Sequence, residues 1–447
     1  MLLAPFLWIF CEFDEKVLDN LSLGRRRNMV LTKKHVIISD ACFSSESKIC
    51  DGKLYIDKED VERQLLCNEF AGVELQIAKP GESVRLTNVG DIIQPVAKSG
   101  CLEDAFPGFT GSLKLAGTGE TVCLDGIAVA EIAELPLMQS SIIDMSGAGA
   151  EQTPFSGMIL TALVAAPAEK TDKNEYLLAL KRAACRLAVI LAKLALDIEA
   201  DYNSEYCFDT APRKTNLPRV CYIYQIFAHK NMIEPFFYGS RCQQILPFTI
   251  DPNEVLDGAM INLNYDLIPF SDTTYTIQNH PVIEELFKRD GKSVDFCGVV
   301  MVNASSTIED KTLSSMRAVF LAKEALHADY AVLTKEGGGH TQVDIELVCD
   351  YCAQMGIKPV IIIAENVSTN GRTDEAVLFN TENANAMISA GCLDMVQLCE
   401  MDRLIGHTPI TDMENMADLR GQCSIYNKYI RGALSQLGAS LHTSYKY

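Results

Sequence analysis

The chain has 447 residues, enough for two or three domains of about 150 residues each, and a core of that size needs no disulfide staples. Its formal net charge of -20 is spread along the chain, which argues against nucleic acid or another polyanion as a partner. The sixteen cysteines are scattered through apolar segments, a pattern that predicts reduced thiols in a cytoplasm rather than a disulfide framework.

The chain begins with an apolar run, MLLAPFLWIF, that resembles a targeting segment only superficially. No positive charge precedes the run, CEFDEK follows it, and it is far shorter than the ~20 residues that span a bilayer. We therefore expect no membrane association. Because Met29 opens a new segment, we interpret residues 1–28 as an extension outside the folded unit.

Residues 29–150 are predicted to form a β-rich domain. Apolar and polar residues alternate between Gly, Pro and Asn punctuation, as in VELQIAKPGESVRLT and TVCLDGIAVAEIAEL. This pattern favours a mainly antiparallel sheet. Residues 151–290 follow as a mixed α/β segment, with an amphipathic helix predicted from Asn174 to Leu196 and a buried strand from Arg219.

From residue 291 to residue 410 the predicted elements alternate between strand and helix. Segments such as VDFCGVVMVNA, TLSSMRAVFLAKEALHA and DYAVLTKE have the spacing of βαβ units, which require a parallel sheet with right-handed crossovers. The fold class is therefore α/β, or α+β overall, with an antiparallel β domain preceding a parallel α/β domain. Residues 411–447 are interpreted as a helical tail.

Three consecutive glycines, Gly337 to Gly339, lie between a predicted strand and the next helix. Free N–H groups at a helix N-terminus bind anions, and ligands bind at the carboxyl ends of parallel strands. The loop matches neither a dinucleotide-binding nor a phosphate-binding motif. A tight turn is therefore favoured over an anion site.

The usual catalytic and metal-binding templates are not found. Cys349 and Cys352 have the spacing of a redox or zinc motif, but they lie within a predicted helix and no second pair completes a zinc site, so we interpret them as core thiols. The seven histidines show no ligand spacing, and no GxSxG elbow occurs. We predict no metal site.

One polar cluster remains without an assignment. It is either a binding loop or a loop that caps the following helix, PVIEELFKRDG. Its members are Thr273, Thr274, Tyr275, Gln278, Asn279 and His280.

From about Asp51 to His407 the sequence resembles the component B proprotein of the glycine, sarcosine and betaine reductases, which is related to the D-proline reductase proprotein. No single short motif carries the resemblance, which rests on the order and spacing of several stretches. The most specific are AKPGESVRLTNVGDIIQP, FPGFTG, SIIDMSGAGAEQTPFS, EVLDGAMIN and TTYTIQNHPVIEELFKRDGKSVDFCGVV.

The resemblance implies an internal cleavage at an Asn-Cys pair, whose cysteine becomes a pyruvoyl group on the downstream fragment. That ketone would condense with a substrate amine, so that a partner's selenolate can attack the α-carbon. The matching pair here is Asn264-Tyr265, and the nearest serine, Ser271, is six positions away. A tyrosine has no β-heteroatom to perform the acyl shift or to be eliminated. We therefore predict an uncleaved chain without a pyruvoyl cofactor.

Three functions stay open for such a chain. It is a component B subunit without its own pyruvoyl group, a non-catalytic paralogue that binds amino acids or serves regulation or assembly, or an enzyme of unrelated chemistry. The resemblance implies an oligomer, a selenoprotein-type or Cys-type reductase subunit as partner, and a small amino acid or N-methylated derivative as ligand. The candidate pocket residues are Asp144, Ser146, Thr274, Gln278, Asn279 and His280.

Overall fold

The structure of the chain is a computed structural model. It describes residues 29–100, 105–135, 137, 141–209, 216–228, 235–243, 245–263, 265, 271–365, 382–407, 418–441 and 445–446. The predicted extension, residues 1–28, and Asn264 lie outside these ranges. No helix within the ranges combines the length and the apolarity that a membrane crossing requires.

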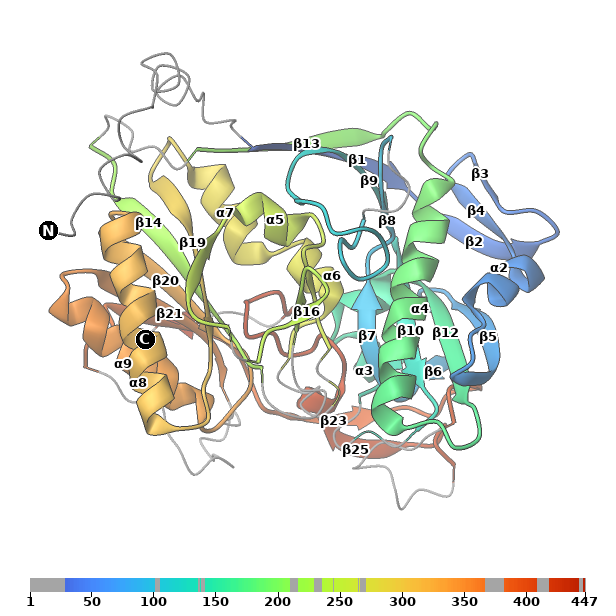
Figure 1. Cartoon of the computed structure of the whole chain (residues 1–447). Helices are drawn as coiled ribbons and strands as arrows, with labels where there is room; N and C mark the ends of the chain where they lie inside the picture. Colours follow the sequence, from blue (N-terminus) through green and yellow to red (C-terminus); the bar gives the residue numbers. More distant parts are fainter. Residues whose placement is uncertain are drawn as a thin grey trace, which may run out of the picture.

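Two four-stranded sheets form the N-terminal part, at the right of Figure 1. Most neighbouring strands are antiparallel, as predicted, but β1 pairs in parallel with β9, and β10 with β12. The sheets are therefore mixed. In spatial order they contain β13 (Tyr202–Phe208), β1 (Met29–Ile37), β9 (Gly119–Asp125) and β8 (Val96–Lys98), and β5 (Phe70–Ala78), β12 (Ile159–Pro167), β10 (Ile127–Ala133) and β7 (Val89–Ile93).

The predicted helix is confirmed as α4 (Lys173–Lys193), which packs across the second of these sheets (Figure 1). Asp172 caps its N-terminus by accepting from the backbone N–H groups of Asn174 and Glu175. Its buried face is rich in Leu and Ala and joins the largest apolar core, which also contains Val129 and Leu163. Because residues alternate along β10, Glu131 lies on the same side as Val129 and faces α4.

Smaller sheets surround this part. They consist of β2 (Asp40–Ser44), β4 (Lys53–Asp57) and β3 (Lys48–Cys50); β11 (Ile143–Asp144), β6 (Val84–Leu86) and β24 (Arg403–Ile405); β16 (Ser240–Arg241), β15 (Phe236–Phe237) and β18 (Met260–Ile261); and β23 (Met395–Leu398) with β25 (Cys423–Tyr426). The short helices are α2 (Lys58–Leu65), α3 (Gly147–Ala150), α5 (Pro252–Leu256) and α6 (Thr274–Gln278).

A seven-stranded sheet forms the other half of the molecule (Figure 1). Its five central strands are parallel, which confirms the predicted α/β part. The spatial order is β17 (Phe248–Ile250), β19 (Asp295–Asn303), β14 (Arg219–Ile226), β20 (Tyr330–Lys335), β21 (Lys358–Glu365), β22 (Ala386–Cys392) and β26 (Tyr445–Lys446). The chain order of the parallel strands is thus 2-1-3-4-5, which places the topological switch point between β14 and β20.

Helices cover both faces of this sheet. Helices α8 (Ile308–Phe320) and α9 (Thr341–Gln354) pack against Cys221 and Ile223 on one face, whereas α7 (Pro281–Arg289) packs near Tyr222 and Tyr224 on the other. A π-helical turn (Leu321–Ala325) follows α8. The predicted strand from Arg219 is confirmed, and it belongs to the parallel sheet although it precedes residue 291.

The C-terminal part of the chain returns to the N-terminal half, so that β24 extends the sheet of β6 and β11. The helical tail predicted over residues 411–447 is wrong for the described part. Residues 418–441 contain strand β25 and a 3-10 turn (Asn427–Tyr429) but no α-helix. The segment is held as a strand because β23 offers it an antiparallel partner, a long-range pairing that overrides weak local preference.

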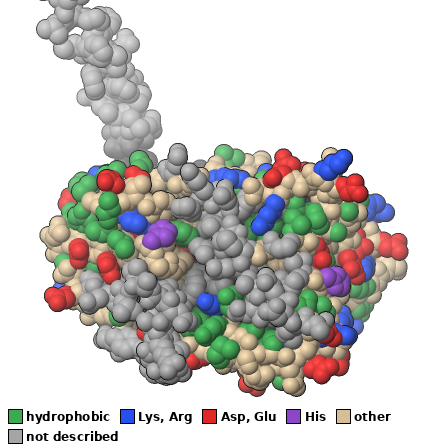
Figure 2. Space-filling model, turned by 90° about the horizontal axis from the view of Figure 1, so that it is seen from below, with side chains coloured by type: hydrophobic (Ala, Val, Ile, Leu, Met, Phe, Trp, Pro, Cys, Tyr) green, Lys and Arg blue, Asp and Glu red, His purple; other side chains and the backbone are tan. Residues whose placement is uncertain are grey.

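Acidic side chains do not gather in one area of the face shown in Figure 2. They are scattered there among apolar and basic side chains. This distribution agrees with the spread of acidic residues along the sequence.

Candidate functional site

Tyr265 lies in the interior, between β18 and α6, with 1% of its surface exposed. Its hydroxyl contacts the Glu131 carboxylate and lies 3.2 Å from the backbone oxygen of Leu177. The Lys181 Nζ atom is 5.4 Å from the centroid of the tyrosine ring. The residue at the predicted former processing site is therefore part of the protein core.

Gly90 provides the room for the Tyr265 ring. A Cβ atom at this position would stand 2.8 Å from Tyr265 Cε1 and 2.9 Å from Glu131 Oε1, closer than real Cβ atoms come. The position of the Tyr265 ring therefore depends on a residue without a Cβ atom at position 90.

Asp91, Glu131 and Lys181 form a buried ion cluster beneath Tyr265. Asp91 on β7 and Glu131 on β10 are directly opposite each other, an arrangement in which like charges repel. Lys181, on the buried face of α4, lies 2.6 Å from Asp91 Oδ2 and 2.8 Å from Glu131 Oε2. Burial opposes the charged lysine, but the two carboxylates outweigh burial, and the pKa of Lys181 is raised.

The Tyr265 hydroxyl has one proton for two acceptors. Burial raises the pKa of Glu131, so its protonated form is favoured more than in water. The phenol donates to Glu131 Oε1, and Leu177 O lies 3.2 Å away as a second acceptor. This hydrogen bond and the charge of Lys181 favour the ionised form of Glu131 and oppose the effect of burial.

Thr274 links the ion cluster to α6. Its backbone N–H donates to Asp91 Oδ1 at 2.9 Å, and its Oγ1 donates to Asp91 Oδ2 at 2.5 Å. Arg431 Nη2 lies 3.8 Å from Asp91 Oδ1. Thr273 caps the helix by accepting from the N–H of Thr276. One of the predicted pocket residues therefore contacts the ion cluster directly.

Gln278 and Asn279 connect α6 to the N-terminal half through hydrogen bonds to Gln94. Gln278 Oε1 accepts from the N–H of Gln94 at 2.9 Å, and Asn279 Nδ2 donates to Gln94 Oε1 at 3.0 Å. Lys33 Nζ donates to the backbone oxygen of Gln278 at 2.5 Å. These contacts give both side chains a structural role, and their predicted role in ligand binding stays a prediction.

His280 faces the parallel sheet. Its Nε2 atom is 3.2 Å from the Tyr222 hydroxyl, which also hydrogen-bonds Thr334 Oγ1. Burial lowers the pKa of His280 to about 3, so the imidazole is neutral near pH 7. The polar cluster from Thr273 to His280 thus joins the ion cluster to the switch point between β14 and β20.

Asp144 and Ser146 are engaged elsewhere. Asp144 forms a buried bidentate ion pair with Arg85, with distances of 2.7 and 2.9 Å. Ser146 Oγ is 3.8 Å from the sulfur of Met401. Their neighbourhood meets the α6 segment through an edge contact between Phe155 and Tyr275, with ring centroids 5.7 Å apart. The six predicted pocket residues therefore divide between two groups of contacts.

The triple glycine is a turn between β20 and α9. Gly337 and Gly339 have φ of +73° and +68°, a region that glycine enters without steric cost. Cys349 and Cys352 are fully buried in α9, and burial raises the pKa of each thiol. They are core residues, as predicted. The described residues contain no group of three metal-ligating side chains.

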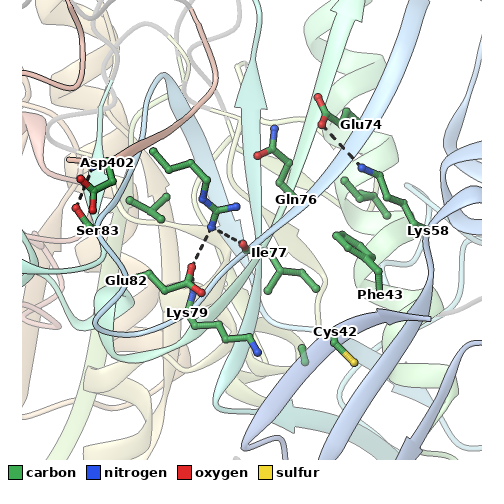
Figure 3. A pocket seen from close by; sticks show the side chains of 14 residues that line it. Cys42, Phe43, Lys58, Glu74, Gln76, Ile77, Lys79, Glu82, Ser83 and Asp402 are labelled. Carbon is green, nitrogen blue, oxygen red and sulfur yellow. Dashed lines mark hydrogen bonds and ion pairs between the residues drawn. The ribbon is translucent and has the colours of Figure 1, made fainter.

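A separate groove of about 650 Å³ runs along β5, β2, α2 and β24 (Figure 3). Two ion pairs lie between its lining residues: Lys58 is 3.8 Å from Glu74, and Arg403 is 2.9 Å from Glu82. None of the predicted pocket residues lines it. The groove is therefore distinct from the site around Tyr265.

Comparison with known proteins gives the family. The family described as glycine/sarcosine/betaine reductase component B subunits matches residues 29–438. The chain belongs to this family. It is 30% identical over 415 residues to the glycine reductase complex component B subunits alpha and beta of Peptoclostridium acidaminophilum, covering 90% of this chain and 96% of that one.

Two further relatives of this component B family member are similar over most of their length. Identity is 29% over 432 residues to the corresponding Acetoanaerobium sticklandii protein, with 94% and 100% of the two chains covered. It is 30% over 377 residues to the sarcosine reductase complex component B subunit alpha of P. acidaminophilum, with 83% and 88% covered. No solved structure matches.

The component B resemblance implies a pyruvoyl group at position 265, and the residue present there does not fit one. The only heteroatom of the Tyr265 side chain is the hydroxyl oxygen at the end of the ring, which is hydrogen-bonded to Glu131 and lies close to Leu177 O. It cannot serve as a leaving group on Cβ.

Sequence reasoning missed the charged residues of the site. Asp91 and Glu131 are single acidic residues within apolar strands, GDII and IAVAEIA, and Lys181 lies at helical spacing from Leu177 and Ala184. A charge at a position that the pattern assigns to the core is the signal that identifies all three. Asp272, Glu336 and Arg431 were missed as well, because only the fold brings them together.

Proposed function

We propose that this component B family member is a pyruvoyl-free subunit of an amino-acid reductase complex. In this role it binds a small amino acid or an N-methylated derivative and assembles with a selenoprotein-type or Cys-type reductase subunit in the cytoplasm. Support for the assembly comes from relatives named as components of glycine, sarcosine and betaine reductase complexes. The described cysteines are free thiols, in keeping with a reducing compartment.

The observation that carries the proposal is the burial of Tyr265 against Glu131, Leu177 and Lys181. A cofactor precursor must expose its carbonyl to attack by its own side chain and later expose a ketone to substrate. The Tyr265 side chain instead fills core volume and closes the ion cluster. The position has acquired a packing function in place of an electrophile.

A non-catalytic regulatory or assembly role is the second candidate, and the same packing favours it. In that case the surface contacts of component B are retained, while the interior no longer accepts a ligand. The two candidates differ in ligand binding, because only the first requires that a small amino acid stabilise the folded chain.

Thermal-shift titration with glycine, sarcosine, betaine and proline distinguishes the candidates. A ligand at 100 times its dissociation constant stabilises the fold by about 2.7 kcal/mol, which gives a measurable shift. The Asp402→Asn variant, altered in the separate groove of Figure 3, is the matched control and should respond as the wild type does. Stabilisation by at least one ligand supports the proposal, whereas no response to any of the four supports the assembly role.

A further inference from the structure

Two buried carboxylates influence each other electrostatically near the switch point of the parallel sheet. Glu336, directly after β20, is fully buried and accepts from the backbone N–H of Phe227 at 3.0 Å and from the Tyr224 hydroxyl at 3.4 Å. Asp272, two residues before the start of α6, is 4% exposed, and its Oδ1 accepts from Ser435 Oγ at 2.5 Å. Its Oδ2 has no hydrogen-bond partner among the described residues. A buried carboxylate oxygen without a partner is costly.

The charges around these carboxylates do not balance. Asp272 and Glu336 share the buried surroundings of Arg431, whose charge also acts on Asp91 and Glu131. Lys181 is the second buried cation of the group. With every group ionised, four carboxylates face two cations, and Asp91 and Glu131 already pair with Lys181. The excess is two negative charges, and one bound cation would reduce it to one.

Aromatic rings border the same place. The ring centroids of Tyr222 and Tyr224 are each 5.1 Å from that of His280 and 5.5 Å from each other. The His280 Nδ1 atom has no hydrogen-bond partner within the described part of the chain. Aromatic faces next to carboxylates attract ammonium groups, including quaternary ones that cannot donate hydrogen bonds.

We propose that Asp272 and Glu336, beside Tyr222, Tyr224 and His280, form the binding site for the cationic amine of a small ligand. The site lies at the carboxyl ends of β14 and β20, where doubly wound sheets bind ligands. It rests on the proposed function in assuming an amino-acid ligand, and it adds which residues bind the amine. Of the predicted pocket residues, His280 borders this site, and Thr274 is close to Asp272 in the chain.

The acids also predict a proton linked to binding. Burial raises the pKa of Glu336 to about 8 and that of Asp272 to about 6, so near pH 7 Glu336 is mainly protonated and Asp272 mainly ionised. A bound cation favours the ionised carboxylate and lowers the pKa of Glu336. Binding at pH 7 therefore releases roughly one proton, and affinity increases as the pH rises from 6 to 8.

The pH dependence of cation binding is influenced by all the titratable side chains around the site. From the elements packed around it these are Asp91 on β7, Glu131 on β10, Lys181 on α4, Tyr222 and Tyr224 on β14, Asp272 and His280 beside α6, Glu336 after β20, and Arg431. Burial raises the pKa of Glu336 to about 8, so this residue titrates within the pH range of the test.

Calorimetry with amine-only and carboxylate-only probes tests the assignment in the full chain. Methylammonium and tetramethylammonium chloride are the cationic probes, and sodium acetate is the anionic one. Titrations at pH 7 in two buffers of different ionisation enthalpy measure the protons released. We expect at least one cation to bind with release of about one proton and acetate not to bind.

The variants Glu336→Gln and Asp272→Asn should each weaken binding of the cation at least tenfold, and Glu336→Gln should abolish the proton release. Glu254→Gln is the matched control, because Glu254 is another poorly exposed acid with a raised pKa, bonded to Tyr238. It should bind as the wild type does. Circular dichroism confirms that each variant is folded.

Two results overturn the assignment. One is the absence of binding by both cations, and the other is equal affinity in the Glu336, Asp272 and Glu254 variants. These results can be told apart from failure of the proposed function. If amino acids bind the Glu336→Gln and Asp272→Asn variants as tightly as the wild type, only this site is refuted. Cation binding without any amino-acid binding supports the site and refutes the ligand part of the proposed function.

Discussion

Replacing Lys181 by methionine tests the buried ion cluster most severely. The substitution keeps most of the side-chain volume but removes the cation that separates Asp91 from Glu131, which are directly opposite each other on β7 and β10. Breaking a buried pair in this way costs about 3–5 kcal/mol, because an uncompensated charge is left behind. For a unit of about 150–250 residues the melting temperature should fall by roughly 6–20 °C.

The assay is thermal unfolding followed by circular dichroism at several pH values. Because burial raises the pKa of Glu131, protonation at low pH neutralises one of the repelling carboxylates in the variant. The loss should therefore be largest at pH 8 and smaller at pH 5. Adding Glu131→Gln to the Lys181→Met variant should recover part of it at pH 8.

The control is Arg289→Met, which removes one partner of an exposed ion pair with Glu285. Pairs of this kind contribute about 0–1 kcal/mol, so the control should hardly change the melting temperature. Equal losses in the Lys181 and Arg289 variants, or a Lys181 loss that does not depend on pH, would refute the electrostatic reasoning.

Three further predictions concern neighbouring residues. Tyr265→Phe keeps the ring but leaves Glu131 and the Leu177 oxygen without the phenol, so urea unfolding should show a loss of about 1–3 kcal/mol; an unchanged midpoint contradicts the hydrogen bonds. Gly90→Ala places a Cβ 2.8 Å from the tyrosine ring and should lower the melting temperature, an effect that Tyr265→Ala should partly relieve. The folded chain holds the proton of Glu336 more tightly than the unfolded chain does, so the stabilisation from this proton is lost as the pH rises toward 8. The Glu336→Gln variant should therefore lose less stability over this pH range than the wild type. Parallel plots of stability against pH for the two proteins would contradict the prediction.

The sequence predicted the parts of the fold that local pattern controls. The 3.6-residue periodicity over α4 and the alternation of strands and helices in the parallel sheet both depend on neighbours along the chain. The parallel pairing of β1 with β9 depends on distant segments, and so does the strand conformation of Cys423–Tyr426, which weak periodicity misassigned to a helix. The residue pattern of a segment determines which face of a helix or strand is buried, whereas tertiary packing determines which strands pair.

The sequence identified one residue of the candidate site, Tyr265, but not the charged residues around it. Tyr265 was identified because it interrupts a family pattern, and its burial agrees with a changed role. Asp272, Glu336 and Arg431 come from three distant segments and look like ordinary loop residues in the sequence. Only the return of the C-terminal segment to the N-terminal half brings Arg431 next to Asp91.

Intact-mass analysis of the purified native protein tests the central claim most directly. A chain with Tyr265 in its core and no heteroatom on Cβ to eliminate should give a single uncleaved species, either the full 49.2 kDa or the species that starts at Met29. It should not react with a hydrazide reagent for ketones. Two fragments that divide between residues 264 and 265, with a ketone-reactive N-terminus on the second, would contradict the account.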